Sequence, residues 1–252
     1  VDLINAGAFE GGAFSIMVHP SNSDKVDKPF LAIAHIDVDF YGKESHAALA
    51  PEMGINALDA AVQAYVNIST MRQHLLATDR IHGIITNGGG APNVIPPHTS
   101  MSWYVRAATK ARLDELLHMM TNQFSGAATA TGCRFEVTPR GHTFTDMAVD
   151  SVLADLYAAN SESLGRPMGR SAATDIMKTG STDMGNVSHE LPSLHPMLDI
   201  KPGKWVNHQR EFAAATIEPA GERAIRDGAL AMAFTVVDVA EQDLWHSLGT
   251  RV

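Results

Sequence analysis

The sequence contains one cysteine, Cys133, in 252 residues. A single cysteine excludes an internal disulfide framework and fits a reducing compartment, so we expect a cytoplasmic protein. Because Cys133 opens a predicted strand, a structural thiol is a simpler interpretation than a nucleophile. No apolar run approaches the ~20 residues of a membrane span, and no signal peptide is visible. The sequence therefore predicts no membrane partner.

Clusters of basic residues are lacking as well. The formal net charge is -9 and the pI is near 5.7, which argues against nucleic acid as a partner. Hydrophobic residues make up 45% of the chain and charged residues 19%, so a sizeable core is expected and disorder is not. The length fits one large domain or two ordinary ones. The chain begins with Val1 in what resembles the middle of a strand-loop pattern, so we expect a C-terminal piece of a longer protein.

A central module shows regular alternation of predicted strands and helices. In its first strand, polar residues at 35, 37 and 39 alternate with apolar residues at 36, 38 and 40, which is typical of a strand with one solvated face. The predicted elements are strand 36–41, helix 55–76, strand 81–86, strand 100–107, a helix through 113–127 and strand 134–137. The order βαββαβ predicts a ferredoxin-like module, with two helices on one face of an antiparallel sheet.

The segments on either side of this module predict a second α/β domain, interrupted by it. Before the module, an apolar run at 13–18 predicts a buried strand that ends at His19. After it, we expect a helix at 149–164, a loop at 180–188, a strand-like segment at 191–200 and a helix at 222–239. The predicted domains are therefore 1–35 and 141–252 for the outer domain and 36–140 for the inserted one.

Two histidines of the outer domain, His19 and His208, are candidates for metal binding. His19 either caps a strand end or is a ligand, since neutral imidazole is a common zinc ligand. His208 is either a surface residue or a ligand that Asn207 and Glu211 orient. His195, before Pro196, is closer to a structural histidine at a strand end. A catalytic zinc site needs about three ligands and a general base, and the sequence contains no full set.

Polar residues in two loops are candidates for substrate contact. Asn93 follows three glycines whose spacing fits no phosphate-binding loop. These glycines allow a tight backbone, and the Asn93 side chain offers an amide to a ligand. Ser181 and Thr182 either line a pocket or cap their own loop, and Asp183 has the same two interpretations. Arg106, at the end of a strand, pairs either with a substrate carboxylate or with a nearby acidic side chain.

Taken together, these motifs resemble the dimetal peptidases and amidohydrolases, the family of aminoacylase and glutamate carboxypeptidase. Gly42-Lys-Glu-Ser-His-Ala, followed by Gly54-Ile-Asn-Ala-Leu-Asp, is similar to the start of the family's lid, or dimerisation, domain. Gly88-Gly-Gly-Ala-Pro-Asn-Val-Ile-Pro and Gly180-Ser-Thr-Asp-Met-Gly-Asn-Val-Ser are similar to the branch of aminobenzoyl-glutamate hydrolases and β-alanyl-lysine (Xaa-Arg) dipeptidases, with the dipeptidases the closer of the two. The resemblance covers nearly the whole chain.

The resemblance implies a role for individual residues. His19 and His208 match metal ligands, and the metal implied is zinc, with manganese as the alternative. His46 matches a lid histidine that reaches the partner subunit's active site and stabilises the oxyanion. Asn93 matches a lid asparagine that touches substrate, and residues 180–188, with Ser181, Thr182 and Asp183, match a wall of the pocket. The other ligands and the general base of the family, a Cys-Gly-His motif and a Glu-Glu pair, would lie before Val1.

Two functions follow from this resemblance. The first is a metal-dependent hydrolase that cleaves the amide bond of a dipeptide or N-acyl amino acid and forms a homodimer through its lid. Its fold would be part of an α/β catalytic domain with an inserted ferredoxin-like lid. The alternative is a truncated, inactive chain that acts as a dimerising or regulatory partner, and on either view we expect the 252-residue chain alone to be inactive.

Overall fold

The computed structural model describes residues 1–248, which fall into two units. Unit 1 combines Val1–Phe30 with the chain from Thr145 onward, and unit 2 is Leu31–Phe144. Unit 2 is therefore inserted between two pieces of unit 1, and we describe each unit by itself. No helix in the described part of the chain has both the length and the apolar character that crossing a membrane requires.

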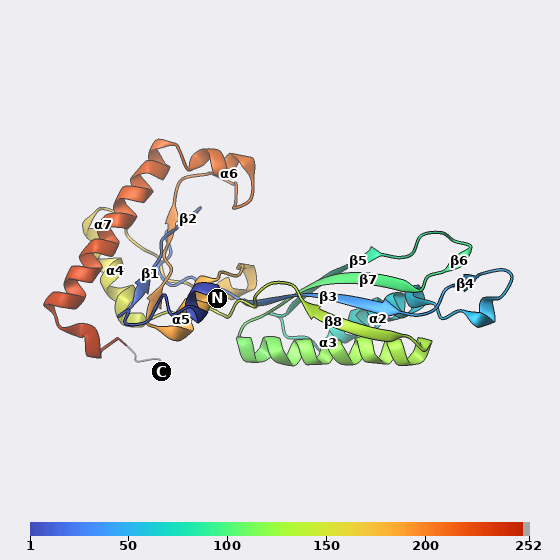
Figure 1. Ribbon diagram of the computed structural model, residues 1–252. Coiled ribbons are helices and arrows are strands. Elements are labelled where there is room, and N and C mark those ends of the chain that lie inside the picture. The colour runs from blue at the N-terminus through green and yellow to red at the C-terminus, as the bar shows by residue number, and fades with distance from the viewer. Residues whose placement is uncertain (249–252) are drawn as a thin grey trace. The chain divides into compact units, whose positions relative to one another are not determined.

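Unit 2 is a four-stranded antiparallel sheet with two helices on one face (Figure 1). Its main elements are β3 (Ala32–Tyr41), α2 (Ala57–Met71), β5 (Arg80–Asn87), β7 (His98–Ala107), α3 (Lys110–Thr131) and β8 (Arg134–Pro139). The strand order is β5-β7-β3-β8. This is the predicted ferredoxin-like module, and the element order is that expected from the sequence.

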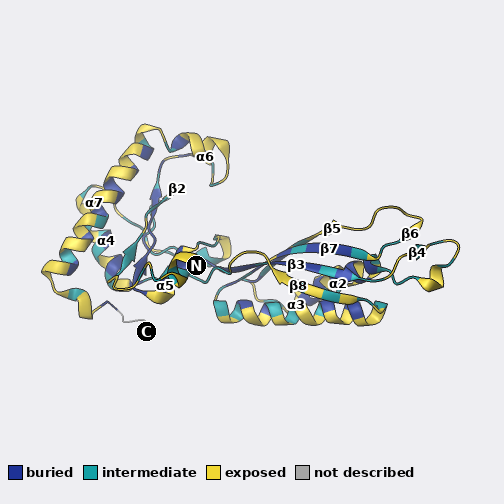
Figure 2. Ribbon diagram, viewed as in Figure 1, coloured by how far each residue is buried: buried dark blue, intermediate teal, exposed yellow. Residues whose placement is uncertain are grey.

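The core of unit 2 lies between the sheet and the helices (Figure 2). Val38, Phe40 and Trp103 point to this side and are fully buried, whereas the alternate residues of β3 and β7 are mostly half-exposed. The side of α2 that enters the core is rich in alanine, and α2 packs on α3. Because alanine is small and is the best helix former, it allows close approach of the two helices without weakening α2.

Capping residues determine where the two helices of unit 2 begin and end. The side chain of Asn56 accepts from the amide of Leu58 at 2.9 Å at the start of α2, and Thr109 accepts from Arg112 at the start of α3. Gly132 ends α3 in the left-handed conformation at φ 75°. The sequence predicted a helix as far as Leu76, but a 3₁₀ turn, η2 (Arg72–His74), replaces its last part.

A second, smaller pair of strands lies in the loops of unit 2. β4 (Ser45–His46) pairs antiparallel with β6 (Val94–Ile95), and the 3₁₀ turn η1 (Pro51–Met53) follows β4. The sequence analysis placed both segments in loops. Strands of two residues are too short to show an alternating pattern, so only the tertiary structure reveals this pair.

Unit 1 contains the remaining helices and two short parallel strand pairs. Its elements are α1 (Asp2–Asn5), β1 (Ser15–Ile16), β2 (His19–Ser21), α4 (Ser151–Ser163), η3 (Asp175–Lys178), α5 (Met184–Glu190), β9 (Ser193–Leu194), β10 (Met197–Asp199), α6 (Arg210–Ala215), α7 (Pro219–Glu241) and η4 (Leu244–His246). β1 pairs with β9, and β2 pairs with β10. Leu153, Tyr157 and Leu194 lie in the core that α4 and α7 form with the strands.

Two expectations for unit 1 were wrong. His19 does not follow a continuous strand at 13–18, because the ladder breaks after β1 and His19 begins β2. Residues 180–188 are not a loop throughout, since α5 begins at Met184. Gly185 does not make a turn there: a β-carbon at this position would collide with the carbonyl oxygen of Thr145, so the glycine allows α5 to lie against that backbone.

Candidate functional site

The β4–β6 pair holds the neutral His46 ring in a defined orientation and tautomer. The amides of Ala48 and Leu49 both donate to Nδ1 of His46, each at 3.2 Å. A ring nitrogen that accepts hydrogen bonds carries the lone pair, so the hydrogen of the neutral ring is on Nε2. His46 is exposed. The ring therefore presents a single N–H donor to the outside of unit 2.

The same strand pair brings His46 and Asn93 together. His46 is opposite Val94 in the ladder, and the amide of Ala47 donates to the carbonyl of Asn93 at 3.0 Å. The glycine-rich segment around Asn93 borders a hollow of about 460 Å³. Gly89 has a φ of 108°, which favours glycine, and it lies against Pro96. Two residues that the sequence analysis named separately are thus neighbours at the surface of one unit.

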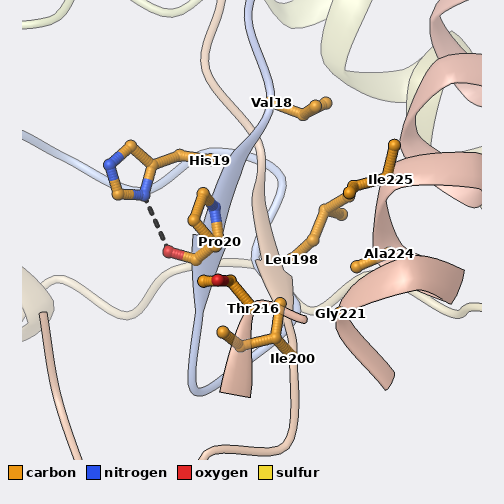
Figure 3. A pocket seen from close by; sticks show the side chains of 9 residues that line it. All are labelled: Val18, His19, Pro20, Leu198, Ile200, Thr216, Gly221, Ala224 and Ile225. Atoms are coloured by element: carbon orange, nitrogen blue, oxygen red, sulfur yellow. Dashed lines mark hydrogen bonds between the residues drawn. The ribbon is translucent and has the colours of Figure 1, made fainter. Parts of the chain in front are cut away.

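In unit 1, His19 lies beside a second imidazole, that of His195. Nδ1 of His19 is 2.7 Å from the carbonyl oxygen of Pro20, so Nδ1 carries the hydrogen and Nε2 the lone pair. The rings of His19 and His195 meet edge to face, with centroids 5.6 Å apart. In Figure 3 the ring of His19 points away from Leu198 and Ile225, which line an apolar pocket of about 190 Å³.

His195 is the most strongly perturbed histidine of this group. It is 2% exposed, and burial lowers its pKa to about 4, a shift to which the charges of His19 and Lys28 add and which Asp183 opposes. Its ring also packs on Phe30, at 5.1 Å between centroids, and the ammonium of Lys28 lies 5.7 Å from the centre of the Phe30 ring. From the sequence alone His195 is predicted to be a structural residue, and no sequence motif indicates this cluster.

The lowered pKa of His195 makes the stability of the chain pH-dependent. The unfolded histidine takes up a proton near pH 6.5 and the folded one only near pH 4, so the unfolded state binds more protons in between. The contribution of His195 to the free energy of unfolding is therefore fully present above about pH 6.5. It is lost as the pH falls towards 4, by about 3 kcal/mol in all. Urea unfolding at pH 7 and pH 4.5 measures most of this loss.

The matched control for this prediction is His195→Asn, which has no group that titrates in this range. Other carboxylates also protonate near pH 4.5, and they do so in both proteins. The difference in pH dependence between the two proteins therefore isolates His195. Equal losses in both proteins would show that His195 is not responsible.

The remaining predicted site residues of unit 1 lie near helix starts. The side chain of Thr182 accepts from the amide of Met184 at 3.3 Å, which supports its interpretation as a cap of its own segment. Asp183, exposed, precedes α5 without a side-chain cap bond, and Ser181 is half-buried. His208 is exposed and has a φ of 72°, just before α6. Within residues 1–248, no three or more side chains of His, Cys, Asp or Glu converge as a metal site.

The outer face of the sheet in unit 2 carries a cationic patch. Arg80 and Arg106 are directly opposite in the β5–β7 ladder, and like charges in such a pair repel. Burial lowers the pKa of His82, and the charges of Arg106, Arg72 and Arg80 lower it further. Burial also lowers the pKa of Arg106 itself. The interpretation of Arg106 as a carboxylate-binding residue stays a prediction.

Comparison with known proteins places this architecture in a family. Residues 32–131 match the peptidase dimerisation domain of the M20 peptidases. The Xaa-Arg dipeptidases of Mus musculus and Homo sapiens are 38% and 37% identical to the chain over 239 and 242 residues. These alignments cover 95% of this chain.

These matches support the placement of the chain in the M20 peptidase family. The resemblance drawn from its motifs is thereby confirmed. The chain spans about half the length, 55%, of the two dipeptidases. The fold is also that of solved structures: an aminobenzoyl-glutamate utilization protein from Klebsiella pneumoniae superposes with a TM-score of 0.63 at 22% identity, over 77% of this chain and 52% of that one.

Proposed function

We propose that the chain is part of a metal-dependent hydrolase that cleaves the amide bond of dipeptides, with N-acyl amino acids as the other substrate class. Unit 1 is assigned to the catalytic domain and unit 2 to the lid. The observation that carries the proposal is the orientation of the exposed His46 ring: two backbone amides donate to its Nδ1, which leaves Nε2–H as the donor. Such a preorganised donor suits an oxygen that becomes negative when an amide carbonyl is attacked.

His19 and His208 are the residues of this chain that would hold the metal. His19 fits this role, because its Nδ1–H donates to the carbonyl of Pro20 and leaves the Nε2 lone pair available for a divalent ion. His208 has an exposed imidazole in unit 1, and an imidazole nitrogen suits the same chemistry. A bound Zn²⁺, or alternatively Mn²⁺, would supply Lewis acidity and lower the pKa of water.

Other residues of the chain would bind and orient the substrate. Asn93 lies next to His46 and offers an amide to the substrate backbone. Asp183, whose charge raises the pKa of His195, would form a polar wall of the pocket together with Ser181 and Thr182. Arg106, opposite Arg80 in the β5–β7 ladder, would supply a guanidinium for the substrate carboxylate.

The proposed reaction is tested on the full-length protein with the dipeptides that its relatives' name suggests. We expect zinc- or manganese-dependent release of arginine from Xaa-Arg dipeptides, and His208→Ala should lower metal affinity at least tenfold and turnover with it. His189→Ala is the matched control, since His189 is also an exposed histidine of unit 1. Unchanged metal content by elemental analysis in His208→Ala would show that His208 is not a ligand.

We further propose that the lid forms a homodimer through the β5 edge and α2. β5 is an edge strand with Ile84 63% exposed, and the outer face of α2 exposes Val62 and Val66. These surfaces adjoin, because Arg72, directly after α2, donates to the carbonyl of Ile81 in β5 at 3.2 Å. An unpaired strand edge next to an apolar helix face is a self-complementary surface, as an interface with twofold symmetry requires.

The dimer is tested on the whole chain by sedimentation at micromolar concentrations. Val66→Lys buries a charge in the proposed interface, so we expect it to raise the dissociation constant at least tenfold. Thr138→Lys places the same charge on β8, at the opposite edge of the sheet, and should leave the dimer intact. A monomeric wild-type chain, or equal effects of both variants, would contradict this interface.

A further inference from the structure

The two parallel strand pairs of unit 1 are one ladder with a gap in the middle. Ile16 pairs with Leu194 and His19 with Met197, so both pairs have the same offset in sequence. The main-chain bonds follow this register: Met17 donates to Leu194 at 3.0 Å and His19 donates to Pro196 at 2.9 Å. The gap is therefore not a change of register.

The gap arises because residue 196 is a proline. Other ladder bonds run from the amides of the later segment to the carbonyls of the earlier one: the amide of Ile200 donates to the carbonyl of Ser21 at 3.0 Å. The same spacing, four residues earlier, would have residue 196 donate to the carbonyl of Met17. Pro196 has no N–H, so this carbonyl would lose its ladder partner. The carbonyl of Met17 can then accept from another donor instead.

The side chain of His195 supplies that donor. Its Nδ1 lies 2.8 Å from the carbonyl oxygen of Met17. Because a carbonyl only accepts, Nδ1 must carry the hydrogen, and Nε2 carries the lone pair. With 2% exposure and Phe30 packed against the ring, His195 has little freedom to turn away from this bond.

This bond acts on the segment that leads directly into His19. Met17 is two residues before His19, and the His195 ring also meets the His19 ring edge to face at an interplanar angle of 73°. His19 is held on its other side by the bond from its Nδ1 to the carbonyl of Pro20. Backbone and ring are thus both restrained, and Nε2 of His19 remains the nitrogen without a hydrogen.

We propose that His195 is a positioning residue, which replaces the missing amide of Pro196 in the ladder and thereby holds the His19 imidazole with Nε2 available for a ligand. The inference rests on the proposed function only in naming that ligand as a divalent metal. His195 acts through the carbonyl of Met17 and binds no metal itself.

Three variants of the 252-residue chain test this role. His195→Phe keeps an aromatic ring but loses the donor. Pro196→Ala restores a main-chain N–H at the gap. The double variant has the restored N–H in place of the lost imidazole donor. Val239→Ala, in the buried core of unit 1 and far along the chain from the ladder, controls for a general loss of stability.

The readouts are the tautomer of His19, by nitrogen NMR of its imidazole, and the affinity for Zn²⁺. In the wild type we expect one His19 tautomer with the hydrogen on Nδ1. His195→Phe should mix the tautomers and weaken zinc binding about tenfold to a hundredfold. The double variant should regain both properties, and Val239→Ala should lower Tm without changing the tautomer of His19.

Two results would overturn the proposal. One is a His195→Phe chain whose His19 spectrum is that of the wild type. The other is a double variant that stays as impaired as His195→Phe, because His195 would then act as a ligand or through its ring alone. If His195→Phe does not fold, His195→Asn takes its place, because asparagine keeps a nitrogen donor near the position of Nδ1. This variant should preserve the single His19 tautomer. A mixture of His19 tautomers in His195→Asn would overturn the proposal. A wild-type chain without zinc affinity would contradict the metal role of His19, while the tautomers still decide the role of His195.

Discussion

Replacing His46 by alanine in the full-length protein is expected to lower kcat about 10²–10³-fold and to leave the metal content unchanged. This factor is typical of the loss of one preorganised donor to a developing oxyanion. The expectation rests on the orientation of the His46 ring. The amides of Ala48 and Leu49 donate to its Nδ1 and leave Nε2–H as the donor. Turnover on an Xaa-Arg dipeptide and elemental analysis of the same preparation measure the two quantities.

A mixing experiment tests whether His46 acts across the dimer. A His46→Ala subunit is mixed with a His208→Ala subunit under conditions that exchange subunits. If His46 serves its partner's site, one site of the heterodimer has both the intact metal ligands and the intact lid histidine. We then expect part of the activity to return, whereas each variant alone stays nearly inactive. Mixing that restores nothing would place His46 in its own subunit's site or in a structural role.

The second large effect is expected in the stability of unit 1, from Arg166→Met. The guanidinium of Arg166 is 11% exposed and donates to Asp24 at 2.9 Å and to Asp227 at 3.1 Å. It also donates to the carbonyl of Asp199 at 3.2 Å. Burial acts to lower the pKa of Arg166, but the bonds and charges of the two carboxylates raise it overall. The cation is therefore held firmly between its partners.

Without Arg166, Asp24 loses the cation it pairs with, and the mostly buried Asp227 keeps only the exposed guanidinium of Arg226, at 3.1 Å. Breaking such a group by removing one partner lowers the free energy of unfolding by about 3–5 kcal/mol. The matched control is Arg170→Met, whose ion pairs with Asp27 and Asp155 are largely exposed. Its loss should be at most about 1 kcal/mol. Urea unfolding of both variants at pH 7 measures the difference, and similar values would show that the Arg166 cluster adds little.

Much of unit 2 can be predicted from sequence because its signals are local. The alternation in β3 and the helical spacing of apolar residues in α2 are set by residues close along the chain. Six elements in the order βαββαβ then leave few arrangements of the sheet, and the ferredoxin-like one is correct. The family followed from motifs such as Gly42-Lys-Glu-Ser-His-Ala, which the matched dimerisation domain contains.

The strands of unit 1 could not be predicted in this way. β1, β2, β9 and β10 have two or three residues each, and their stability comes from pairing with strands about 180 positions away. A strand of this length has no periodic pattern. The sequence therefore predicts one strand through residues 13–18 and gives no sign of the break that Pro196 causes in the ladder.

The sequence by itself determined the fold of unit 2, the family and the chemical type of the candidate residues, because periodicity and motifs depend on neighbours in the chain. Only the tertiary structure decided which candidates meet. It placed Asn93 beside His46 through a pair of two-residue strands, and it set the buried imidazole of His195 against His19. These contacts depend on hydrogen-bond register between distant segments, and no local pattern in the sequence records that register.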